Sequence, residues 1–70
     1  LSAAALSVDC PPALLERLPE TERPGLLAVL ANDPRPRYQN DPQRLYGLTY
    51  AGHNVTFRVE GDKVTVVGVE

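Results

Sequence analysis

The sequence predicts a small α+β domain, with two short helices packed on one face of a three- to four-stranded antiparallel sheet. Residues 44–69 alternate apolar and polar side chains, with short Gly-containing turns between the apolar runs. Leucines recur at helical spacing in residues 11–18 and 21–32. A chain of 70 residues is the length of one domain, so we expect residues 1–70 to form a single small domain.

Two turns define the strands of the expected meander, residues 44–69. The Gly-Asp pair at 61–62 fits a two-residue hairpin loop, and the Gly-His pair at 52–53 fits a type II′ turn with Gly first. With these loops, Phe57 would face Leu48 on one neighbouring strand and Val66 on the other. Both loops therefore place the large apolar side chains on the same side of the sheet.

The two faces of this sheet differ in chemistry. The apolar face, which the helices should cover, carries Tyr46, Leu48, Tyr50, Val55, Phe57, Val59, Val64 and Val66. The opposite face would carry small, β-branched and polar residues: Gly47, Thr49, Thr56, Arg58, Thr65, Val67 and Val69. We expect this second face to meet water or a partner. Its candidate partner-binding residues are Thr49, Thr56, Val67 and Val69.

Helix starts and stops precede the meander. Asp9 followed by prolines 11–12 is a helix start, and Pro19 ends that helix. Thr21 is a candidate N-cap for the second helix, which Pro34 terminates by disfavouring the α conformation at the residue before it. Residues 33–43 are rich in proline and lack apolar periodicity, so we expect a connection over the surface.

Composition excludes several classes of function. The net charge is −2 and the isoelectric point is about 5.2. The chain therefore has no overall excess of positive charge that would attract nucleic acid or an anionic membrane. One Cys and one His are too few for a metal site, and no Gly-rich phosphate loop is present; no metal or cofactor is expected. No apolar run reaches transmembrane length, and the lone Cys is compatible with a cytoplasmic location.

The strongest polar signal is a set of four arginines in the connection and the sheet. Planar guanidinium groups bind phosphate oxygens in pairs, so these residues are candidate phosphate- or RNA-binding groups. The alternative is that they are solvated charges balanced by nearby carboxylates. The sequence does not decide between these two interpretations. The four residues are Arg35, Arg37, Arg44 and Arg58.

Over residues 13–69 the chain resembles the RelE/ParE superfamily of small bacterial toxins. The resemblance rests on the leucine-faced helix pair, the segments DPRP at 33–36 and RLYG at 44–47, and the run NVTFRVEGDKVTVVGV at 54–69. It implies a compact α+β fold. It also implies cleavage of messenger RNA on the ribosome or poisoning of DNA gyrase, and neutralisation by an antitoxin that wraps the toxin.

The chain differs from that family at positions that correspond to the family's catalytic residues. Asn54 stands where the family has a strand arginine, and Phe57 stands where it has a tyrosine. The resemblance therefore implies a cytoplasmic toxin–antitoxin type protein that acts mainly by protein binding, with ribosome-dependent mRNA cleavage weak or lost. No catalytic residue can be named, and whether the chain is an enzyme stays open.

A second hypothesis is a non-toxic protein-interaction domain that shares only the fold, such as an immunity-protein-like domain or a subunit module. The acidic isoelectric point and the open second face of the sheet favour it. Under either hypothesis we expect a protein partner, either an antitoxin-like chain or a second copy. RNA or the ribosome is a further candidate partner, and a membrane is not.

Overall fold

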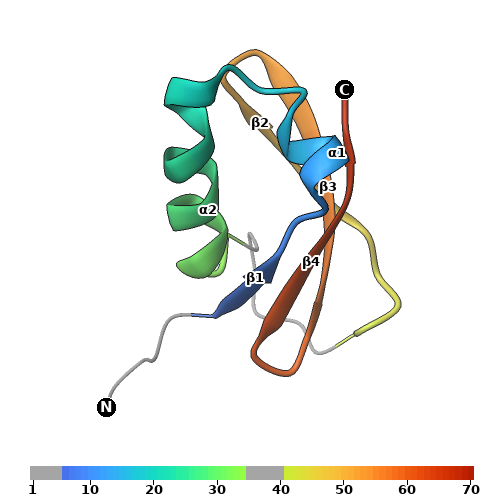
Figure 1. Ribbon diagram of the computed structural model, residues 1–70. Helices are drawn as coiled ribbons and strands as arrows, with labels where there is room; N and C mark the ends of the chain where they lie inside the picture. The colour runs from blue at the N-terminus through green and yellow to red at the C-terminus, as the bar shows by residue number, and fades with distance from the viewer. Residues whose placement is uncertain (1–5, 35–40) are drawn as a thin grey trace.

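The computed structural model describes residues 6–34 and 41–70 (Figure 1). Along these residues the elements follow in the order β1 (Ser7–Asp9), α1 (Pro12–Leu15), the 3-10 turn η1 (Glu20–Glu22), α2 (Arg23–Ala31), β2 (Tyr46–Tyr50), β3 (His53–Glu60) and β4 (Lys63–Val69). The strands form one sheet in the order β1-β4-β3-β2. The predicted α+β class is confirmed.

The sheet is mixed, and the prediction of a purely antiparallel sheet is wrong. β1 pairs in parallel with β4, with Ser7 opposite Lys63 and Asp9 opposite Thr65. Hairpin turns reveal only antiparallel neighbours, whereas parallel strands need a long crossover. Here the whole helical segment and two further strands separate β1 from β4, so no local signal indicated the pairing.

The hairpin at residues 61–62 has the predicted register, with Phe57 opposite Val66. The other hairpin differs, because its two-residue loop is Ala51–Gly52, with φ of 52° and 80°. Positive φ at both loop residues is the signature of a type I′ turn. Leu48 consequently faces Val55 instead of Phe57. The shift is by two residues, so the same side chains still point to the core.

A β-bulge changes the end of β4. Thr56 pairs with Gly68 whereas Phe57 pairs with Val66, which leaves Val67 as the extra residue. An extra residue reverses the alternation of the side chains that follow it. Val69 is therefore in the core, with 1% of its surface exposed, and not on the second face where strict alternation placed it.

The helices are shorter than the leucine pattern predicts. α1 ends at Leu15, and Leu18 lies in the following loop with 1% of its surface exposed. α2 starts after the 3-10 turn and ends at Ala31 with Asn32 as its C-cap. Pro19 separates the two segments because a proline inside a helix removes a backbone hydrogen bond.

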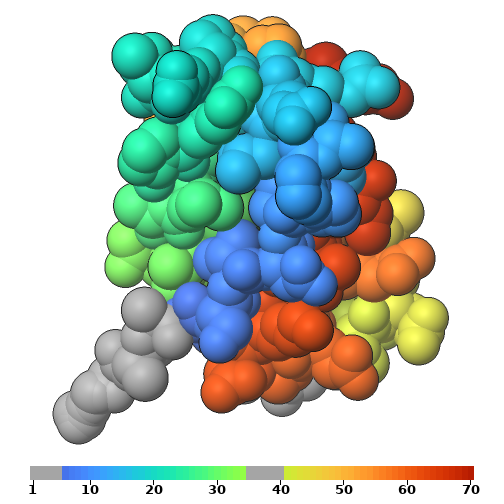
Figure 2. Space-filling view, viewed as in Figure 1, coloured from blue at the N-terminus to red at the C-terminus, as the bar shows by residue number. Residues whose placement is uncertain are grey.

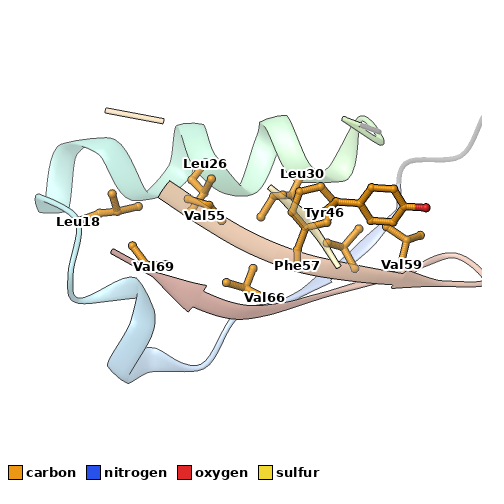
Figure 3. Packing of buried hydrophobic residues seen from close by; sticks show 10 residues of the cluster. Leu18, Leu26, Leu30, Tyr46, Val55, Phe57, Val59, Val66 and Val69 are labelled. Carbon is orange, nitrogen blue, oxygen red and sulfur yellow. The ribbon is translucent and has the colours of Figure 1, made fainter. Parts of the chain in front are cut away.

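The helices cover one face of the sheet. Figure 3 shows side chains from the helical layer pointing at those of β2, β3 and β4. In the space-filling view, α2 and the N-terminal segment that contains α1 form much of the near side of the molecule (Figure 2). α1 packs against β4. The buried apolar residues are Leu18, Leu26, Leu30, Tyr46, Val55, Phe57, Val59, Val64, Val66 and Val69.

Candidate functional site

The face of the sheet turned away from the helices is the candidate site, and we call it the outer face. The burial pattern of the strands alternates, so their more exposed positions belong to this face. Small and hydroxyl-bearing side chains are frequent among them. The outer face consists of Ser7, Asp9, Gly47, Thr49, Asn54, Thr56, Arg58, Glu60, Lys63, Thr65, Val67 and Gly68.

The middle of the outer face is flat. Thr56 on β3 pairs with Gly68 on β4 and with Gly47 on β2, so two of three adjacent positions have no side chain. Near the end of β2, the Thr49 hydroxyl lies 3.4 Å from Oδ1 of Asn54, to which it donates. A flat surface with hydroxyl donors can approach a large partner closely.

The charges of the outer face are balanced. Nζ of Lys63 lies 3.8 Å from Oδ2 of Asp9, and both side chains are more than half exposed. Such a pair contributes little to stability, because water screens it. Arg58 is opposite Thr65, and within residues 6–34 and 41–70 no carboxylate forms an ion pair with it. Its guanidinium group is thus available to a ligand.

The structure places Arg44 and Arg58, the two candidate arginines among the described residues, on opposite faces of the sheet. Cζ of Arg44 lies 5.5 Å from the centroid of the Tyr46 ring, whose side chain belongs to the core face. Arg58 belongs to the outer face, so the sheet separates the two cations. Arg35 and Arg37 lie outside the described residues. Phosphate binding by these arginines stays a prediction.

The candidate partner-binding residues fall into three environments. Thr49 is exposed and Thr56 is half-buried, both on the outer face. Val67, the bulge residue, is 40% exposed, which is unusual for a large apolar side chain in the middle of a strand. Val69 is buried, so it cannot present its side chain to a partner.

Sequence reasoning missed a contact between β2 and the segment formed by η1 and α2. The Tyr50 hydroxyl donates a hydrogen bond to Oε1 of Glu22 at 3.4 Å. Partial burial raises the pKa of Tyr50, and the Glu22 charge and this hydrogen bond raise it further. A Cβ at Gly25 would overlap the Tyr50 hydroxyl. A glycine inside a helical pattern was the one available signal of this close approach.

Tyr46 is the other polar side chain of interest. Its ring stacks on Phe57 with centroids 5.6 Å apart. Its hydroxyl is buried, and none of the described residues bonds to it. The ring belongs to the core, and the hydroxyl points along the sheet (Figure 3).

No cluster of three or more His, Cys, Asp or Glu residues suited to a metal ion occurs in residues 6–34 and 41–70. In the same part of the chain, no helix has the length and apolar character needed to cross a bilayer.

Cys10 is half-buried between β1 and α1. Burial raises the pKa of its thiol, and the neighbouring Asp9 charge raises it further. Because the thiolate is the nucleophile, we expect Cys10 to react severalfold more slowly with a thiol reagent at pH 8 in the folded chain than in the urea-unfolded chain. Reaction rates measured against pH in both states check this expectation. Equal rates at all pH values would contradict it.

Comparison with known proteins identifies the family. A family model described as the TrmO C-terminal domain matches residues 3–70, which is nearly the whole chain. No curated protein and no solved structure matches significantly. The match contradicts the RelE/ParE resemblance, so the toxin–antitoxin interpretation is wrong. Helix pairs followed by valine-rich hairpins occur in unrelated proteins, and fold-level similarity does not determine function. The hypothesis of a non-toxic domain fits the match better.

Proposed function

We propose a function from the premise that this chain belongs to the TrmO C-terminal domain family. That family is associated with a tRNA methyltransferase. On this basis the domain is an accessory part of a tRNA-modifying enzyme. It would help to hold the tRNA by its outer face, while another part of the enzyme supplies the reacting groups.

The observation that supports this role is the unpaired guanidinium group of Arg58 on a flat, hydroxyl-rich surface. Arginine and threonine are common contacts to nucleic-acid phosphates, which position a protein without reading sequence. Thr65 is directly opposite Arg58, and Thr56 lies two residues away on the same strand and face. The carboxylates of Asp9 and Glu60 on this face keep the attraction modest, so the domain would assist binding rather than dominate it.

Replacing Arg58 with alanine in the complete enzyme tests the proposal. Loss of one phosphate contact should raise the KM for tRNA about three- to tenfold, because a charge-assisted hydrogen bond contributes on the order of 1 kcal/mol or more. The slope of log KM against log salt should fall by about one. The kcat should stay unchanged, since Arg58 would not contact the reacting atoms. Methyl transfer to tRNA, measured at several salt concentrations, supplies all three quantities.

The matched control is Arg17→Ala, which removes the same charge from an exposed position in the loop after α1. It should change neither KM nor its salt dependence. If the two substitutions changed KM equally, the effect would come from the net charge of the domain and not from a contact made by Arg58. An unchanged KM and salt slope for Arg58→Ala would show that the outer face does not contact tRNA.

A further inference from the structure

The strand β2 forms one edge of the sheet and has an unused row of backbone groups. Asn54 bonds to Glu70 through both its N–H and its C=O, at 2.8 and 2.9 Å respectively, so its backbone groups point away from β2. Thr49, opposite Asn54, therefore points its own backbone groups outward. By alternation the same holds for Gly47 and Leu45. No backbone bond from the rest of the described chain reaches these groups.

The other edge of the sheet is protected in ways that β2 is not. β1 is only three residues long, and Leu6 just before it donates to the carbonyl of Ala31 at 2.8 Å. Its Asp9 also places a charge at the edge. Natural edge strands are commonly short, charged or interrupted by proline, which prevents unwanted pairing. β2 has the sequence YGLTY, without a charge or a proline.

Apolar surface accompanies the free edge of β2. Leu48 and Tyr50 are only half-buried, although their side chains belong to the core face. Leu45, just before the strand, is 52% exposed. The core is thus incomplete along this edge, and another strand placed beside β2 would extend it.

We propose that β2 pairs with β2 of a second copy of this chain, antiparallel and about a twofold axis at Gly47, so that the two sheets become one. This register brings all the outward backbone groups together. Gly47 meets Gly47 of the second copy, and Leu45 meets Thr49 of the second copy. Both partners present the same patch, as a twofold interface requires.

The charges at the two ends of β2 are complementary in this register. Arg44 of one copy comes opposite Tyr50 of the other, on the core-face side of the sheet where its guanidinium group already lies against Tyr46. The Tyr50 hydroxyl is bonded to the Glu22 carboxylate. Each copy therefore offers a cation to the other copy's carboxylate, and the symmetry repeats the contact.

Pairing of one short strand buries less surface than a standard protein interface, so we expect micromolar or weaker association. Sedimentation velocity of residues 1–70 from about 1 μM to 1 mM should show a reversible monomer–dimer equilibrium. Gly47→Lys should raise the dimer dissociation constant about 100-fold or more, because two like charges would meet at the axis. A Cβ at residue 47 would meet only the Val55 carbonyl oxygen at 3.8 Å, so the monomer should tolerate the change.

The matched control is Val67→Lys, which adds the same charge to the outer face on β4, away from the edge. It should leave the dissociation constant unchanged. Far-UV circular dichroism verifies that each variant is folded. A wild-type chain that stays monomeric at 1 mM overturns the proposal, and so does dissociation by Val67→Lys without dissociation by Gly47→Lys.

Swapping the charges of Arg44 and Glu22 provides a second test, which does not depend on a substitution at Gly47. Arg44→Glu and Glu22→Arg should each weaken the dimer about tenfold, and the double variant should recover most of the loss, since the opposite charges again face each other. Failure of the double variant to recover would exclude the register centred on Gly47. These measurements contain no tRNA, so their outcome is independent of the role proposed for Arg58.

Discussion

Replacing Phe57 with alanine is expected to remove a large part of the free energy of unfolding of this chain. Phe57 has 1% of its surface exposed and stacks on Tyr46. Removing a buried phenylalanine ring costs about 3–5 kcal/mol through lost burial and the cavity that remains. A 70-residue domain has a total stability of only roughly 4–10 kcal/mol. The loss is thus a large part of the whole free energy of unfolding.

Urea unfolding followed by far-UV circular dichroism measures this effect. The control is Val67→Ala on the neighbouring strand, where 40% of the side chain is exposed. A surface change of this kind should alter the free energy of unfolding by about 0.5 kcal/mol or less. Similar unfolding midpoints for the two variants would contradict the position of Phe57 at the centre of the core.

The second large effect should come from Gly25→Ala. Alanine normally favours a helix over glycine by about 1 kcal/mol. Here the added Cβ would overlap the Tyr50 hydroxyl, so either α2 or the tyrosine ring must move. Overpacking of this kind costs about 1–3 kcal/mol. We therefore expect a net loss of stability where helix propensity alone predicts a gain, and thermal or urea unfolding can determine the sign.

Tyr50→Phe provides the partner substitution for a double-mutant cycle. Alone it removes the hydrogen bond to Glu22 and should cost about 1 kcal/mol or less. Combined with Gly25→Ala it removes the overlapping atom, so the double variant should be more stable than the sum of the single effects predicts. Gly68→Ala is the control glycine, because its Cβ would meet Thr56 Cβ at an ordinary 3.9 Å. Simple additivity would argue against the Gly25–Tyr50 contact.

The candidate site was only partly predictable from the sequence. Alternation along β3 placed Thr56 and Arg58 on the face away from the core, because side chains two residues apart share a face. It failed for Val69, since the bulge at Val67 depends on how β4 fits against β3. The approach of Tyr50 to Gly25 joins residues distant in the chain, and no spacing rule reports such contacts. The functional resemblance also failed, because it rested on a common arrangement of helices and hairpins.

The sequence by itself determined the features that depend on neighbouring residues. These are the α+β class, the Gly61–Asp62 turn and the apolar face centred on Phe57, which follow from local turn chemistry and side-chain periodicity. Only the tertiary structure decided the parallel pairing of β1 with β4, the bulge that buries Val69 and the exposed edge of β2. Each of these depends on which distant strands become neighbours, and that choice is made by the packing of the whole chain.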